Sequence, residues 1–252
     1  MKIKITLLFT VLVFVGTVFK ANGQVDNTFT GVDAGANNTG NYNTGYGVSA
    51  LMNNTSHSNN AFGFEALTMS KGGFNCAFGN EALSLNDSGT LNCAFGTRSL
   101  SNNISGSSNI AIGHRTLEAN VVGNYNTAVG YFSLLKNIGN RNIALGYYTP
   151  RHLQSGDDNI FIGTETAINL MRGSNNVLMG NRIILDRNPS TPFLAGNDTS
   201  RSIIIADGIG NQRIFIQKNG NMGIGLGNNV IPVNKLDIKG GVTICRSDHS
   251  RC

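Results

Sequence analysis

The sequence has few charged residues and no clustered basic face. Asp, Glu, Lys and Arg together make up 13% of its 252 residues. The formal net charge of +5 falls to +2 without residues 1–23, because that segment holds three of the 19 Lys and Arg and none of the 14 acids. A nucleic-acid-binding protein needs a concentrated positive surface. The composition therefore argues against that class of function.

The chain also lacks helical patterns and, after residue 23, any long apolar run. Its 32 glycines, with frequent asparagine, interrupt every window in which a helical stripe could form. No later segment has the roughly 20 apolar residues that cross a bilayer core. A hydrophobic content of 40% is too high for a disordered linker. The sequence predicts an all-β fold built largely from turns, without an integral membrane segment in the mature chain.

Residues 1–23 read as a signal peptide. Lys2 and Lys4 form a basic start, residues 5–19 are an apolar run, and small residues precede residue 24, as a signal peptidase requires. An uncleaved membrane anchor is the alternative, but the run is short for a bilayer and is closed by Lys20. We expect a secreted or cell-surface protein that begins near Gln24.

An internal repeat of 16 or 17 residues determines the architecture. It is anchored by ten glycines: Gly31, Gly47, Gly63, Gly79, Gly96, Gly113, Gly130, Gly146, Gly163 and Gly180. An asparagine stands four residues before each anchor glycine: Asn27, Asn43, Asn59, Asn75, Asn92, Asn109, Asn126, Asn142, Asn159 and Asn176. Leucine stands four residues after six of them, and a second glycine stands seven before most of them. The repeat spans residues 24–184.

Each repeat reads as a turn, a short strand, a glycine bend and a second short strand. A unit this small cannot bury an apolar face alone, but parallel stacking at roughly 4.8 Å per coil lets each coil cover the next. In-register stacking also places the asparagines in a hydrogen-bonding ladder. We predict a parallel β-roll, or β-solenoid, of about ten coils.

The best-formed strands alternate β-prone residues with alanine, as in Asn109-Ile-Ala-Ile-Gly113. Period two places the larger residues on one face and the alanine on the other. We expect the larger side chains to face the core. The alanines, and the small residues three after each glycine, would then suit close approach of another chain in a homo-oligomer. A monomeric solenoid capped at its ends is the alternative.

The repeated Asn-x-Ala-x-Gly unit between residues 27 and 181 resembles the head repeats of trimeric autotransporter adhesins. That resemblance implies a left-handed parallel β-roll and a homotrimer that binds a host or cell-surface protein or a glycan. Residues 201–244 are similar to the neck of bacterial surface fibres and phage tail fibres. Residues 185–200 read as a linker and residues 245–252 as an irregular tail. The membrane-anchoring segment and self-cleaving chaperone of these families have no counterpart in the sequence, so neither is carried over.

We predict no catalytic, cofactor-binding or metal-binding residues. Gly223-Ile-Gly225-Leu-Gly227 lacks the strand, helix and downstream acid of a phosphate-binding loop. Asp157-Asp158 lies on a turn without the nine-residue repeat of calcium-binding solenoids. The histidines fall at unrelated positions of the repeat, with no spacing that would bring two onto one metal: His57, His114, His152 and His249.

Two sets of residues gain meaning from the register. Cys76 and Cys93 both stand three before an anchor glycine, so stacking brings them within disulfide range; two buried or unlinked thiols are the alternative. The second set is the predicted contact patch, which reads as the only aromatic cluster of the roll: Tyr131, Phe132, Tyr147 and Tyr148. It would contact a ligand or line the seam of a trimer. Glu81 and Arg98, in adjacent coils, are expected to form an exposed ion pair.

These patterns together favour a non-enzymatic structural and adhesive fibre protein. A prophage-derived tail-fibre spacer is one alternative. A secreted carbohydrate-active enzyme on a β-solenoid scaffold is another, but such enzymes gather acids or a histidine in one groove, and the register shows no such convergence.

Overall fold

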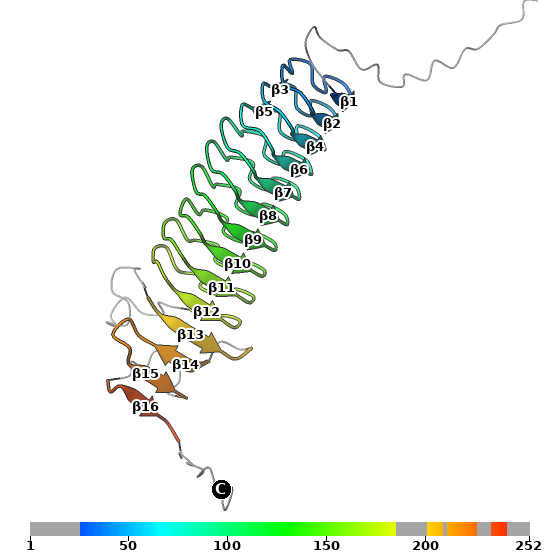
Figure 1. Ribbon diagram of the computed structural model, residues 1–252. Helices are drawn as coiled ribbons and strands as arrows, with labels where there is room; N and C mark the ends of the chain where they lie inside the picture. The colour runs from blue at the N-terminus through cyan, green and yellow to red at the C-terminus, as the bar shows by residue number, and fades with distance from the viewer. Residues whose placement is uncertain (1–25, 185–200, 209–210, 226–232, 241–252) are drawn as a thin grey trace, which may run out of the picture.

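The computed structural model describes residues 26–184, 201–208, 211–225 and 233–240. The predicted signal peptide, linker and tail lie outside these ranges. The described chain is all β, without a helix, and winds into a parallel β-solenoid of about 11 turns (Figure 1). The predicted fold class is confirmed.

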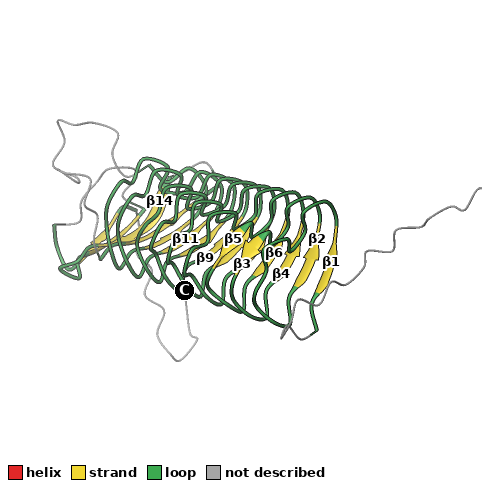
Figure 2. Cartoon of the chain, turned by 90° about the horizontal axis from the view of Figure 1, so that it is seen from above, coloured by secondary structure: helices red, strands yellow, loops and turns green. Residues whose placement is uncertain are grey.

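One wall of the solenoid is a long parallel sheet. Each coil contributes one strand to it, paired with the residues one repeat away, as in Ala111↔Ala128. The strands are β1 (Thr28–Thr30), β2 (Thr44–Tyr46), β4 (Asn60–Phe62), β6 (Cys76–Phe78), β7 (Cys93–Phe95), β8 (Ile110–Ile112), β9 (Thr127–Val129), β10 (Ile143–Leu145), β11 (Ile160–Ile162) and β12 (Val177–Met179). Seen from above, they form one layer and the loops form the opposite side (Figure 2).

The second wall is made mostly of turns, which corrects the prediction of a second strand in each coil. Two-residue strands occur there only as β3 (Asn53–Asn54) and β5 (Met69–Ser70) within the described part. In most coils, the residues two and four after the anchor glycine have a positive φ, such as 53° at Arg115 and 52° at Leu117. This backbone still bonds from coil to coil, because Leu117 N donates to Ser133 O at 3.0 Å.

The core lies between the sheet and the second wall, and its alanines point inward. Ala111 and Ala128 are fully buried, whereas Ile110 and Ile112 are 41% and 42% exposed. The prediction that the larger residues face the core is therefore wrong. The small residues three after the glycine, such as Ser99 and Thr116, are fully buried as well. A coil of 16 or 17 residues is too thin for two rows of large side chains, so alanine on the sheet meets leucine on the second wall.

In two coils the large and the small core side chain change places between the sheet and the second wall. Phe161 replaces the sheet alanine in the coil anchored by Gly163, and Ala167 replaces the leucine opposite it; both are fully buried. In the first coil Phe29 occupies the sheet position, and a Cβ on Gly35 would lie 2.5 Å from its ring. Because close packing tolerates volume-conserving changes best, the core keeps its width through both exchanges.

The asparagine column forms a buried ladder, as predicted. Asn109 Oδ1 accepts from the backbone N of Asn126 at 2.9 Å, and Asn92 Oδ1 accepts from the backbone N of Asn109 at 3.0 Å. In most coils the amide nitrogen also donates to the carbonyl of a nearby glycine, as Asn109 does to Gly123 O at 2.8 Å; Asn43 donates to Ser56 O instead. The asparagine side chain of one coil therefore provides the hydrogen-bond partner that a buried backbone N–H of the next coil needs.

A second buried polar column, which sequence reasoning missed, stands seven residues after the anchor glycine. Asn103 and Asn120 belong to it, and Asn120 Nδ2 donates to Asn103 Oδ1 at 3.1 Å. Asn103 also donates to Gly106 O at 2.8 Å, the carbonyl that Asn92 reaches from the first column at 2.8 Å. The two columns converge on glycine carbonyls and form one hydrogen-bonded corner.

The predicted neck region continues the same sheet and then reverses direction. Strand β13 (Ile203–Ala206) pairs in parallel with β12. Strands β14 (Gln212–Ile216) and β15 (Met222–Ile224) are antiparallel, and β16 (Leu236–Ile238) returns to parallel pairing. All four extend the row of coils at its C-terminal end (Figure 1), in a sheet of 14 strands.

Candidate interaction surfaces

The outward side of the long sheet is predominantly apolar from β2 to β13. We call this surface, formed by the residues one and three before each anchor glycine and their counterparts in β13, the sheet face. Its exposed large apolar members are Tyr46, Phe95, Ile110, Ile112, Ile143, Leu145, Met179, Ile203 and Ile205. Soluble monomers seldom expose a continuous apolar surface that runs the length of the molecule. The single chain therefore leaves an extensive apolar face without a partner.

Four aromatic rings stack along the N-terminal half of the sheet face. The ring centroids of Tyr46 and Phe62 are 5.0 Å apart, those of Phe62 and Phe78 are 4.5 Å apart, and those of Phe78 and Phe95 are 4.8 Å apart. Tyr131 and its neighbours are thus not the only aromatic cluster of the roll. The signal was present in the sequence, as an aromatic residue directly before the anchor glycine in four consecutive coils.

Cys76 and Cys93 lie side by side on the sheet face, as the register predicted. Both are free thiols of intermediate exposure, so the structure has the unlinked alternative rather than the disulfide. Burial raises the pKa of each thiol, and the neighbouring cysteine raises that of Cys76 further. The neutral thiol is therefore the dominant form near pH 7.

These raised pKa values predict slow thiol chemistry. In a chain with Cys245→Ser and Cys252→Ser, we expect maleimide labelling of Cys76 and Cys93 to be slower at pH 7.5 than labelling of free cysteine. Labelling should accelerate as the pH rises beyond the ordinary thiol pKa, because the thiolate is the nucleophile. Labelling as fast as that of free cysteine at pH 7.5 would contradict the burial of this pair.

The predicted contact patch forms a compact cluster on the second wall. Phe132 and Tyr148 stack at 5.3 Å with ring planes 3° apart, and Tyr131 and Tyr147 stack at 5.4 Å. The two pairs meet edge to face, as Tyr147 meets Tyr148 at 4.3 Å. Phe132 is only 7% exposed, whereas Tyr131 and Tyr147 are 41% and 46% exposed. Only part of the cluster is available to a ligand.

Ion pairs on the second wall are centred on Glu118, whose side chain is 6% exposed. Glu118 lies 3.1 Å from Arg98 and 2.6 Å from Arg115. The predicted pair between Arg98 and Glu81 is present at 3.5 Å. Beside it is a shallow hollow of about 300 Å³ whose lining includes Glu65. Sequence reasoning missed Glu118 because it stands outside the column of Arg98 and Arg115.

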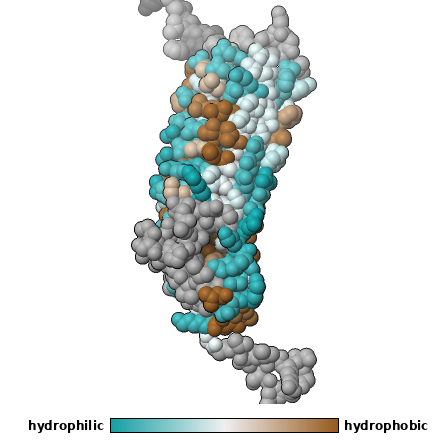
Figure 3. Space-filling model, turned by 90° about the vertical axis from the view of Figure 1, so that its left-hand side faces the viewer, coloured by the Kyte–Doolittle hydropathy of each residue, from teal (hydrophilic) through white to brown (hydrophobic). Residues whose placement is uncertain are grey.

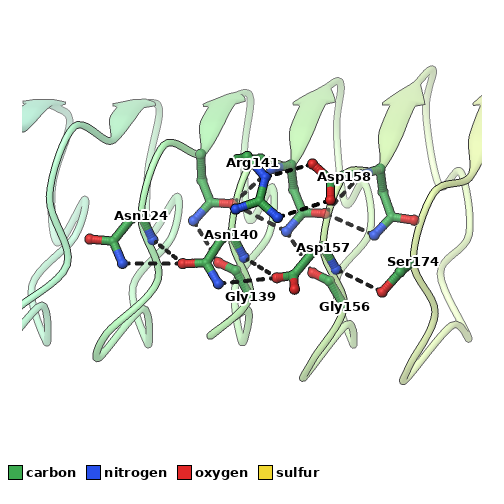
Figure 4. A network of polar contacts seen from close by, with 11 residues as sticks. Asn124, Gly139, Asn140, Arg141, Gly156, Asp157, Asp158 and Ser174 are labelled. Atoms are coloured by element: carbon green, nitrogen blue, oxygen red, sulfur yellow. Dashed lines mark hydrogen bonds and ion pairs between the residues drawn. The ribbon is translucent and has the colours of Figure 1, made fainter.

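The two acids at Asp157-Asp158 take part in a ladder at the edge of the coils. Asn124 N donates to Asn140 Oδ1 at 3.0 Å, and Asn140 N donates to Asp157 Oδ1 at 2.7 Å (Figure 4). Arg141 binds Asp158 through two nitrogens, at 2.7 and 3.0 Å (Figure 4). This contact lowers the pKa of Asp158. Both acids therefore have protein partners that hold neighbouring coils together.

The described ranges contain no group of three or more His, Cys, Asp or Glu side chains that could hold a metal ion. Within the same ranges, no helical segment has the length and hydrophobicity of a membrane span. The side of the molecule shown in Figure 3 mixes polar side chains with separate apolar groups.

Two extended surfaces remain as candidates for interaction: the sheet face, and the aromatic and charged part of the second wall. Neither a protein-family model nor a curated protein nor a solved structure matches the chain.

Proposed function

We propose that this chain is the body of an exported, non-enzymatic fibre of a bacterial surface, assembled as a homotrimer through the sheet face and adhesive on its outer side. The observation that carries the proposal is the continuous apolar sheet face. Removing such a surface from water stabilises an assembly by about 25 cal/mol per Å² of apolar area. A partner that covers the whole face must be as long as the solenoid.

A second copy of the same chain meets that requirement. Its sheet face has the same length and coil spacing, so apolar residues can meet apolar residues in every coil. Closed symmetric assemblies of identical chains are the most common soluble oligomers. The number three and a left-handed coil come from the resemblance of the Asn-x-Ala-x-Gly repeat to trimeric adhesin heads. Adhesion to a host, cell or glycan surface comes from the same resemblance.

The inward alanines change the predicted interface but not the predicted assembly. Ala111 and Ser133 are fully buried within one chain, so they cannot contact another copy. Ile110, Ile112 and their counterparts in other coils take that role. In a trimer built this way the second wall lies on the outside, where a ligand can reach it.

The mass of the mature chain in solution tests the proposal. Light scattering under oxidising and reducing conditions should give three times the chain mass in both, because apolar burial and not a disulfide holds the assembly. A stable monomer at micromolar concentration would exclude this function, whatever the second wall binds.

A lysine at the centre of the sheet face should separate the chains. Ile112→Lys would bury a charge without a partner in each chain, which costs several kcal/mol per ion. We expect the variant to sediment as a monomer whose far-ultraviolet circular dichroism is that of the wild type. The matched control is Val122→Lys, because Val122 is 47% exposed but lies outside the sheet. An assembled Ile112→Lys variant, or a control that dissociates equally, would contradict this interface.

A further inference from the structure

An aromatic platform on the second wall holds two arginines. The stacked rings of Phe132 and Tyr148 form this platform. Arg115 Cζ lies 4.8 Å from the Phe132 centroid, and Arg151 Cζ lies 4.9 Å from the Tyr148 centroid. A guanidinium on a ring face is held by cation–π attraction and keeps donors free at its edge. The platform therefore orders both cations before any ligand arrives.

The positive charge that no carboxylate pairs on the described part of this wall belongs to Lys136 and Arg151. Arg98 and Arg115 both contact Glu118, and Arg98 also lies 3.5 Å from Glu81, so these two guanidinium groups have carboxylate partners. Within the described residues, Arg151 and Lys136 form no salt bridge, and the buried Nε of Arg151 has no hydrogen-bond partner. Burial lowers the pKa of His152, and Arg151 and Lys136 lower it further. These observations indicate a local positive potential around Arg151.

Two exposed tyrosines border this potential. Tyr131 and Tyr147 stand one residue before the platform residues of their coils and meet them edge to face. Each offers an apolar ring and a hydroxyl group that donates and accepts hydrogen bonds. A ligand here would meet cations beside flat, partly polar rings. We call Arg115, Tyr131, Lys136, Tyr147 and Arg151 the basic–aromatic patch.

We propose that the basic–aromatic patch binds an acidic glycan, with its carboxylate or sulfate groups on the arginines and its sugar rings against the tyrosines. Guanidinium groups match such anions with paired hydrogen bonds. The patch spans three adjacent coils, or roughly 10 Å between its outer cations at the spacing of parallel strands, which suits an elongated polymer along the solenoid. An acidic peptide would satisfy the cations but not the exposed tyrosine rings.

The acidic glycan would be the ligand of the adhesive side of the proposed fibre, so the biological role of this binding rests on the proposed function. Binding itself needs only the second wall. The sheet face is on the other side of the core, so the patch stays accessible whether the chain is a monomer or assembled.

Binding of the mature chain to immobilised polysaccharides tests the inference. The probes are alginate for carboxylates, heparin for sulfates, dextran as a neutral polymer and poly-glutamate as an acidic peptide. We expect binding to alginate or heparin that weakens with salt and none to dextran. The two acidic polymers distinguish the carboxylate and sulfate sources.

A double variant, Lys136→Gln with Arg151→Gln, should weaken that binding at least about tenfold, since two charge-assisted contacts are lost. The matched control, Lys71→Gln with Arg213→Gln, removes the same charge from exposed ion pairs away from the patch and should bind like the wild type. Light scattering of each variant should give the wild-type mass.

Three outcomes would overturn the inference: no binding to either acidic glycan, equal losses in the two double variants, or poly-glutamate binding as tight as that of the glycans. Each can occur with the assembly intact. A monomeric wild type that still binds alginate would overturn the proposed fibre instead and leave the patch standing.

Discussion

Gly96→Ala should destabilise the centre of the solenoid by about 4 kcal/mol, the sum of backbone strain and overpacking at one site. Gly96 has a φ of +132°, a conformation that residues with a side chain rarely adopt. A Cβ there would lie 2.5 Å from the carbonyl oxygen of Gly113 in the next coil. The obstacle is backbone, which cannot rotate away as a side chain can.

Denaturant unfolding followed by circular dichroism, with hydrogen exchange to locate the loss, checks this expectation. Because a solenoid can unfold in parts, exchange should increase first in the coils that contain Gly96 and Gly113. The control is Gly208→Ala, since nothing lies within 4 Å of a Cβ at Gly208. If both variants unfold like the wild type, the glycine bend does not need the close approach that the structure shows.

The coil stack was predictable because it depends on spacing. Ten glycines at intervals of 16 or 17 residues, each with an asparagine four residues earlier, determine the parallel register, and the strand pairs follow it residue by residue. Cys76 opposite Cys93 and the pairing of Arg98 with Glu81 follow from the same count. Contacts between equivalent positions of adjacent coils need only the repeat length.

The prediction of which strand face points inward was wrong. The alternation of alanine with larger residues defines two faces of the strand, but it does not say which of them is buried. The deciding signal was the paired exchange of volume. Phe161 appears at the alanine position in the coil where Ala167 replaces leucine, and Phe29 appears in the coil that has Gly35. When a larger side chain at one position accompanies a smaller one at another, the two side chains must share the same limited space. Comparing the sheet position with the leucine position in each repeat would therefore have placed the alanines in the core.

The second wall was harder to predict because its backbone is unusual. Glu81, Arg98 and Arg115 have φ values of 54°, 57° and 53°, a conformation that costs residues with a side chain about 1 kcal/mol or more. Propensity alone argues against such residues there. Hydrogen bonds between coils and the buried leucines offset this strain, and both depend on neighbours that a single repeat does not reveal. Sequence analysis also missed the contacts of Glu118 and Arg151, because their partners stand at different positions of the repeat.

The asparagine ladder should matter more to stability than any exposed ion pair. The pairs of Arg141 with Asp158 and of Lys71 with Asp87 lie at the surface, where such contacts contribute about 0–1 kcal/mol. The ladder lies inside, where an unpaired polar group costs about 1–3 kcal/mol. It also joins consecutive coils in the same way, so the loss of one asparagine affects the coils on both sides.

Asn109→Ala should accordingly cost about 3 kcal/mol, close to the effect of an unsatisfied buried group plus a lost hydrogen bond. The substitution leaves the buried N–H of Asn126 without its acceptor, because Asn109 Oδ1 receives that bond at 2.9 Å. It also removes the bond from Asn109 Nδ2 to Asn92 Oδ1 at 3.1 Å. The control is Asn102→Ala, since Asn102 is partly exposed beside the hollow and should change stability by about 0.5 kcal/mol at most. The denaturant midpoints of the two variants distinguish the cases. Equal midpoints would mean that the ladder contributes no more to stability than a surface amide does. A large loss of stability confined to Asn109→Ala would show that this buried column, and not the charged surface, holds the coils in register.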